Sequence, residues 1–149
     1  MNPPRCLIAE DEPLLAAEFE RLDDYLALMA VRMGARLQVR LDLPDELRTL
    51  PVPPLLLQPL VENSIQHGLE PKVEGGRIEV AATREDKLLV LTVRDSGIGL
   101  SGGPARAGGG FGLSQVRERL ATVYGGRARF HLSPAEGGGA LARIEIPLP

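Results

Sequence analysis

The 149-residue sequence lacks the features of several protein classes. Its single cysteine, Cys6, excludes an internal disulfide framework and suits a reducing compartment. The first residues show no apolar signal core behind a basic flank, so we expect a cytoplasmic protein. No run approaches the ~18 apolar residues of a membrane helix, and a net charge of −3 does not indicate a nucleic-acid partner.

Aromatic residues are scarce, at 3% with no tryptophan, whereas glycine is concentrated in one stretch. Close to half of the 17 glycines fall between positions 97 and 112. Apolar residues make up 44% of the chain, an ordinary share for a globular protein, and the length suits about one domain. The glycine-rich stretch is short and lies between predicted strands and helices, so we interpret it as a loop of a folded domain.

The first periodic segment predicts a helix over residues 15–33, with Gly34 as its stop signal. Its apolar residues are spaced 4, 3, 4, 3 and 4 apart, a narrow seam of two positions per heptad. The seam residues are Leu15, Phe19, Leu22, Leu26, Met29 and Met33. Such a seam needs cover, either from its own domain or from a second copy of the helix. The narrow spacing favours pairing, so we expect a homodimer through residues 13–33.

Further elements follow from alternation and from turn residues. Strict alternation predicts a strand over residues 36–43, and PVPP leads into a helix over about residues 54–67. Pro59 lies deep in that helix, so we expect a kink there or a helix that begins properly only at Pro59. The segments RIEVAAT and KLLVLTV predict two strands joined by a short turn.

After the glycine-rich stretch, the pattern predicts a helix over residues 113–124 and two last strands, RARFHLS and ALARIEI. Strands gathered in one mixed sheet with helices on one face predict an α/β two-layer sandwich, preceded by the long heptad helix.

Three motifs carry candidate chemistry. LVENSIQHG places Asn63 and His67 on one helix face, with Glu62 about 100° round the helix from Asn63. RDSGIGL, with Asp95, Gly97 and Gly99, follows a strand, and GGGFGL at residues 108–113 opens a helix. Taken alone, each has an ordinary explanation: a histidine that satisfies a carbonyl, an aspartate turn, a flexible joint.

Together and in this order, the motifs resemble the N, G1 and G2 boxes of the GHKL ATP-binding domain, shared by gyrase, Hsp90, MutL and histidine kinases. LLLQPLVENSIQHG is most similar to LytS-type sensor histidine kinases, whose N box typically reads LLLQPLVENAIKHG. The resemblance extends from about Leu15 to Pro149.

The resemblance implies an ATP site with Mg²⁺. Asn63 would offer an amide oxygen to the metal. Asn63, His67 and Glu62 are the candidate catalytic residues. Asp95 would accept a hydrogen bond from the exocyclic amine of adenine, which selects ATP over GTP, and Gly97 and Gly99 would let the backbone approach the base.

The G2 box would hold the triphosphate on backbone amides at a helix N-terminus. Its residues are Gly108, Gly110, Gly112 and Leu113. The preceding SGGPARAGG resembles a lid, in which Arg106 is either a phosphate contact or a solvated loop charge.

Two departures from the family affect activity. Family members that hydrolyse ATP carry a water-activating Glu four residues before the Asn, where this chain has Pro59, so we expect ATP to be held for transfer. The only histidines are His67 and His131, and neither lies in a P-H-F-x-x-N phosphoacceptor motif. Phosphotransfer would therefore occur in trans, to a phosphoacceptor helix or a response regulator.

The head of the chain, RCLIAEDEP, resembles the first strand of a receiver domain, with an acidic pair at Glu10 and Asp11. We therefore divide the chain into a receiver-like remnant (1–12), a heptad helix for dimerisation or linkage (13–34) and a GHKL ATP-binding domain (35–149). Two other readings stay open: a non-catalytic dimerisation or sequestering module with a vestigial nucleotide site, and a serine kinase of the anti-sigma type.

Overall fold

A computed structural model describes residues 13–99 and 110–149. Within these ranges, five strands form one sheet in the order β1-β2-β3-β5-β4. The strands are β1 (Leu37–Asp42), β2 (Gly76–Glu85), β3 (Leu88–Asp95), β4 (Arg129–Pro134) and β5 (Ala140–Pro147). β1 pairs with β2 in parallel, and the other neighbours are antiparallel, so the sheet is mixed as predicted.

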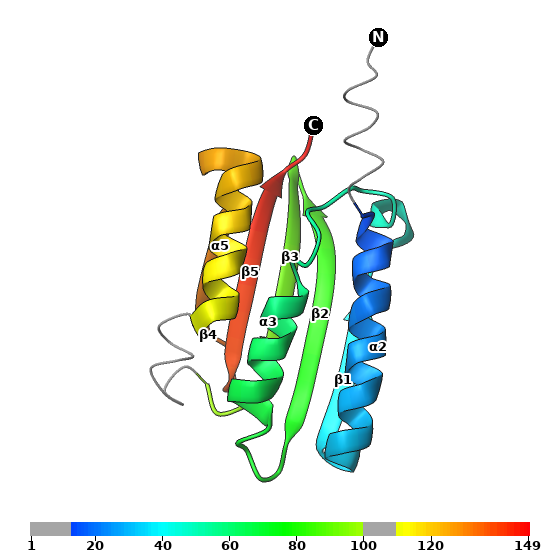
Figure 1. Ribbon diagram of the computed structural model, residues 1–149, viewed down its shortest axis with the longest axis vertical. Coiled ribbons are helices and arrows are strands. Elements are labelled where there is room, and N and C mark those ends of the chain that lie inside the picture. The colour runs from blue at the N-terminus through cyan, green and yellow to red at the C-terminus, as the bar shows by residue number, and fades with distance from the viewer. Residues whose placement is uncertain (1–12, 100–109) are drawn as a thin grey trace.

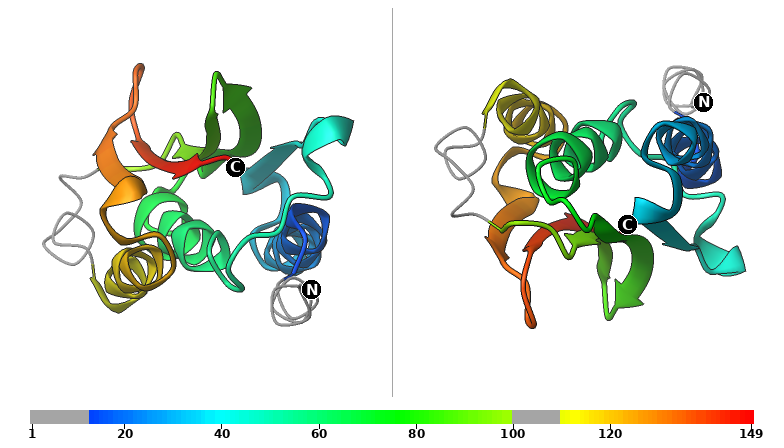
Figure 2. Two further views of the ribbon diagram at one scale, coloured as in Figure 1. Left: turned by 90° about the horizontal axis from the view of Figure 1, so that it is seen from above. Right: turned by 90° about the horizontal axis from the view of Figure 1, so that it is seen from below.

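Three α-helices cover one face of this sheet (Figure 2). They are α2 (Leu15–Met33), α3 (Gln58–Asn63) and α5 (Gly110–Tyr124). α3 lies between α2 and α5 in the helix layer, and α2 packs against the edge strand β1 (Figure 1). The predicted two-layer α/β sandwich with a long first helix is confirmed. None of the helices in the described ranges combines the length and the apolar character that a membrane span requires.

The seam of α2 is buried within the chain itself. Leu22 and Leu26 are each 1% exposed, and they share one core with Leu37 of β1 and Leu60 of α3. Of the two kinds of cover expected, the structure shows cover by the chain's own domain. This burial removes the physical reason given for a homodimer through residues 13–33, which stays a prediction. The seam is narrow because α2 lies at the end of the helix layer, where its main partners among the helices and strands are the edge strand β1 and the helix α3.

The helix that carries the N box begins later than predicted. α3 starts at Gln58, not near Pro54, and Pro59 lies in its first turn, where a proline costs no backbone hydrogen bond. The alternative that the helix begins properly only around Pro59 is therefore confirmed. The preceding Leu55 has a positive φ of 57°, which ends any regular helix at that point.

This helix also ends differently from the prediction. From Ser64 to Leu69 it continues as a wider π-helical turn, in which the Glu70 N–H donates to the Ile65 carbonyl at 2.8 Å. The predicted end at His67 is therefore two residues short. π-Turns are rare, and they occur often at functional sites.

The remaining elements agree with the sequence to within a few residues. α5 begins at Gly110, three residues before the predicted start, so Gly112 lies inside its first turn. Arg117 of α5 stacks over the Phe130 ring of β4 at 4.6 Å, which ties the helix to the edge of the sheet. In β1, Val39 is 40% exposed whereas Leu37 is buried, because an edge strand is covered only in part.

Candidate nucleotide-binding site

The three motifs meet at one end of the helix layer. The π-helical end of the N-box helix, the end of β3 and the start of α5 all lie at the lower end of the domain in Figure 1. α3 packs directly against α5, and the π-helical turn contacts β3. Segments that lie more than 40 residues apart in sequence are thus brought to one edge.

The loop after β3 is bonded to the end of the N-box helix. The Ile98 N–H donates to the Gly68 carbonyl at 2.9 Å, and the Lys72 ammonium donates to the Ser96 carbonyl at 2.8 Å. Ser96 is tied to β2 as well, because its hydroxyl accepts the Arg77 N–H at 2.8 Å. The G1 loop and the N-box helix therefore form one hydrogen-bonded unit.

Gly97 is required for this junction. A Cβ added at Gly97 would overlap the backbone carbonyl of Gly68, which has no freedom to yield. A second close approach comes from Gly139, at a φ of 91°, where a Cβ would overlap the carbonyl of Asp95. The resemblance assigned Gly97 to a close approach to the base, and the sequence predicted no contact for Gly68 or Gly139. The loop PAEGGG offered the only signal, a run of three glycines before a strand.

Asp95 is a buried carboxylate at the end of β3, 1% exposed. It alternates with the buried Leu91 and Val93, so its side chain lies on the sheet face that the helices cover. Its Oδ1 accepts the Gly97 N–H at 2.9 Å, which holds the side chain within the turn. A buried carboxylate is costly unless it is hydrogen-bonded, so this position is specialised.

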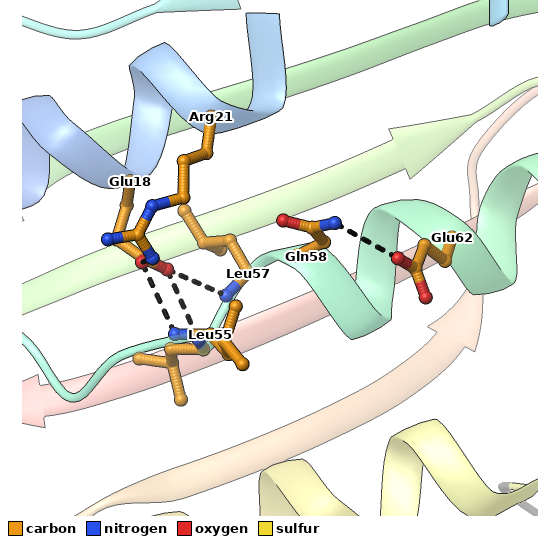
Figure 3. A network of polar contacts seen from close by, with 7 residues as sticks. Glu18, Arg21, Leu55, Leu57, Gln58 and Glu62 are labelled. Carbon is orange, nitrogen blue, oxygen red and sulfur yellow. Dashed lines mark hydrogen bonds and ion pairs between the residues drawn. The ribbon is translucent and has the colours of Figure 1, made fainter. Parts of the chain in front are cut away.

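The N-box side chains divide between two environments. Asn63 is half-buried and His67 is exposed. Glu62 accepts a hydrogen bond from the Gln58 amide at 3.1 Å (Figure 3). Burial raises the pKa of Tyr25 in α2, and the carboxylates of Glu62 and Glu70 raise it further. Glu62 therefore lies on the side of the helix near Tyr25.

The start of α5 contributes backbone amide groups to the candidate site rather than side chains. Gly110 and Gly112 lie in its first turn, where amide groups have no intrahelical acceptor. Leu113 is 1% exposed and belongs to the core, so its side chain anchors the helix. Gly99 has a φ of 82°, a conformation suited to glycine. The candidate residues Arg106 and Gly108 lie outside the described residues.

The described residues suit a metal that arrives with phosphates better than a metal held by protein alone. Residues 13–99 and 110–149 contain no group of three or more His, Cys, Asp or Glu side chains that could hold an ion. Mg²⁺ is commonly bound by one or two protein oxygens together with water and substrate phosphates. The half-buried amide of Asn63 fits that kind of ligand set.

Comparison with curated proteins identifies relatives among sensor kinases. The sensor histidine kinase BtsS of Escherichia coli K12 is 35% identical over 135 residues, which cover 91% of this chain and 23% of BtsS. The sensor histidine kinase YesM of Bacillus subtilis is 32% identical over 144 residues, covering 94% of this chain and 24% of YesM. The sensor protein LytS of Enterococcus faecalis is 28% identical. The chain spans about a quarter of the length of these relatives.

Solved structures share the fold. The catalytic domain of histidine kinase ThkA, in a nucleotide-free form, superposes with a TM-score of 0.68 at 17% identity, covering 93% of this chain and 97% of that one. The blue-light activated histidine kinase EL346 of Erythrobacter litoralis superposes with a TM-score of 0.60 at 19% identity, covering 93% and 47%.

The motif-based resemblance to GHKL proteins is confirmed by a family model. The model for the histidine kinase-, DNA gyrase B-, and HSP90-like ATPases matches residues 54–149, which include all three motifs. The match does not extend to the receiver-like head. The chain belongs to the histidine kinase-, DNA gyrase B- and HSP90-like ATPase family, as a domain related to the BtsS, YesM and LytS sensors.

Proposed function

We propose that this chain is the catalytic domain of a sensor histidine kinase, which binds ATP with Mg²⁺ and transfers the γ-phosphoryl group in trans. The observation that carries the proposal is the junction of two motifs, where the Ile98 N–H donates to the Gly68 carbonyl at the end of the helix layer where α5 begins. Family membership supports ATP as the nucleotide. The names of BtsS and YesM support the class of reaction.

In this proposal, each motif binds one part of the nucleotide. The Asp95 carboxylate accepts from the exocyclic amine of adenine, and Gly97 and Gly99 line the base. Asn63 supplies an oxygen to Mg²⁺, which neutralises charge on the phosphates when bound. His67 lies one turn further along the same helix, on the phosphate side.

The triphosphate is proposed to lie at the start of α5, where the amides of Gly110 and Gly112 favour an anion. The motif alone assigns Gly108 to the same role. Arg106 is proposed as a further phosphate contact. Glu62 has the weakest claim to a catalytic role, because its carboxylate raises the pKa of Tyr25 and therefore lies near α2.

The first test of the proposal is nucleotide titration. We expect the chain to bind ATP more tightly with Mg²⁺ than in EDTA, and ATP more tightly than GTP. Asp95→Asn makes an acceptor into a mixed donor and acceptor, and should weaken ATP binding by ~1–3 kcal/mol while lowering the preference over GTP. Calorimetry measures both, with circular dichroism to confirm that the variant is folded.

Two results would count against these assignments. Equal affinity of the wild type for ATP and GTP would remove the adenine-reading role of Asp95. No binding of either nucleotide would favour the reading of the chain as a non-catalytic interaction module.

The phosphotransfer step has its own test. Because Pro59 stands where a water-activating Glu is expected, we predict slow ATP hydrolysis, and because neither His67 nor His131 has a phosphoacceptor context, we predict no stable phosphohistidine on the isolated chain. Incubation with radiolabelled ATP should label an added helical fragment that carries an acceptor histidine, and not the chain itself. Label on the isolated chain that survives base but not acid would contradict transfer in trans.

A further inference from the structure

Among the residues that the structure describes, one buried charged side chain lies outside the three motifs. Glu18 of α2 is 2% exposed. It follows Leu15 by three residues and precedes Leu22 by four, so it shares the apolar face of α2. It forms an ion pair with Arg21 at 3.4 Å, and Arg21 is half-exposed. A carboxylate buried to this degree needs hydrogen-bond donors.

The donors come from the segment that leads into the N-box helix. The Glu18 carboxylate accepts the backbone N–H groups of Leu55 at 3.2 Å, Leu56 at 3.1 Å and Leu57 at 3.5 Å (Figure 3). α3 has no side-chain cap from its own first residues. A residue 37 to 39 positions earlier therefore binds the three backbone N–H groups that lead into this helix and end at its N-cap, Leu57.

The three hydrogen bonds to Glu18 restrict movements of α3 that apolar packing alone permits. Leu60 and Val61 bury α3 against the sheet, but apolar contact is non-directional and permits sliding and rotation about the helix axis. Three hydrogen bonds to one carboxylate set the axial position of the start of the helix, and they hold Leu55 in its positive φ of 57°. Asn63 ends the same helix, so its side chain moves with that start.

We propose that Glu18 is a positioning residue for Asn63, acting through the start of α3 to hold the asparagine amide where a phosphate-bound Mg²⁺ meets it. The inference rests on the proposed function. It assigns to α2, which lies outside the three motifs, control over the metal-binding position of the site.

The test separates the metal-dependent part of ATP affinity from stability. For each variant, the Kd for ATP is measured in EDTA and in Mg²⁺ at a temperature well below the unfolding midpoint. The ratio of the Kd in EDTA to the Kd in Mg²⁺ is then compared between the variants. We expect Glu18→Ala to lower the wild-type ratio about tenfold, as loss of supporting contacts around a metal ligand does. Affinity in EDTA should stay unchanged. Glu18→Gln keeps one acceptor oxygen and should give an intermediate ratio.

Two control variants give the limits against which the Glu18 variants are compared. Glu20→Ala removes an exposed carboxylate from the same helix and should leave the ratio at its wild-type value. Asn63→Ala should abolish the Mg²⁺ dependence outright. Hydrogen exchange gives an independent readout, since the amides of residues 55–57 should exchange faster in Glu18→Ala than in Glu20→Ala.

The outcomes are distinguishable. If the wild type does not bind ATP, the proposed function fails. If it binds, and Asn63→Ala loses the Mg²⁺ dependence while both Glu18 variants keep the full ratio, only the positioning role is overturned. If Asn63→Ala keeps the dependence, Asn63 is not the ligand, which overturns the positioning role also. Should Glu18→Ala fail to fold, the ratio for Glu18→Gln decides by the same criteria.

Discussion

Replacing Leu22 and Leu26 together by Asp is expected to unfold the domain. Each side chain is 1% exposed and lies in the single core that α2 shares with β1 and α3. Truncating one such leucine to Ala costs ~2–5 kcal/mol, and burying a carboxylate in its place costs more. Two such truncations alone cost ~4–10 kcal/mol, and with the two buried carboxylates the total is comparable to or larger than the ~5–15 kcal/mol that stabilises a typical domain. Circular dichroism should show loss of ordered helix and strand at 25 °C.

The matched control uses the opposite side of the same helix. Leu28 is 63% exposed and Val31 is 84% exposed, so Leu28→Asp with Val31→Asp should change stability by no more than ~0.5 kcal/mol per site. Light scattering decides between cover by the domain and cover by a second copy. A dimeric wild type together with a folded, monomeric Leu22→Asp, Leu26→Asp variant would show that the seam is a dimer contact after all.

The periodicity of α2 predicted the helix, but it did not predict which surface covers its apolar face. The spacing of its apolar residues predicted the helix bounds correctly, because burial along one face has the same period whatever covers it. The spacing could not show which part of the protein packs on that face. The narrow seam suggested a coiled coil, yet within the domain the same stripe is covered by β1, by α3 and by the segment that leads into α3.

The candidate site was predictable to the extent that its parts are local. The order of the three motifs was enough to identify the family, since each motif is a short run at the end of one element. Contacts between runs were not predictable. The sequence predicted no role for Glu18, although its place between Leu15 and Leu22 on the apolar face was a usable signal. Its partners are backbone amides at Leu55 and Leu56, which no side-chain pattern reveals.

The start of the N-box helix is an example of the same limit. Pro54 is an acceptable first-turn residue, so a local rule predicted the helix from there. Leu55 instead takes a left-handed φ, and α3 begins at Gln58. A leucine adopts this conformation only when its surroundings hold it, and here a carboxylate from α2 binds its N–H.

Gly97→Ala is expected to damage both stability and nucleotide binding. The new methyl group would overlap the Gly68 carbonyl, so the loop at residues 95–98 must move away from the N-box helix. The Ile98 to Gly68 hydrogen bond would then lengthen or break. Overpacking of this kind costs ~1–3 kcal/mol. Because the same movement separates Asp95 from the helix that carries Asn63, affinity for Mg-ATP should fall by about 100-fold, the effect of misplacing a binding group by roughly 1 Å.

Gly126→Ala is the matched control for this change. A Cβ at Gly126 meets no atom within 4 Å, and its φ is not in the left-handed region, so stability and affinity should stay near the wild-type values. Chemical denaturation gives the free energy of unfolding, and calorimetry below the midpoint gives the affinity of the folded protein. Wild-type values of both for Gly97→Ala would mean that the loop and the helix end are not in contact. Lost stability with wild-type affinity would mean that the contact exists and that the nucleotide binds elsewhere, because any site built across this junction must open when its two sides are forced apart.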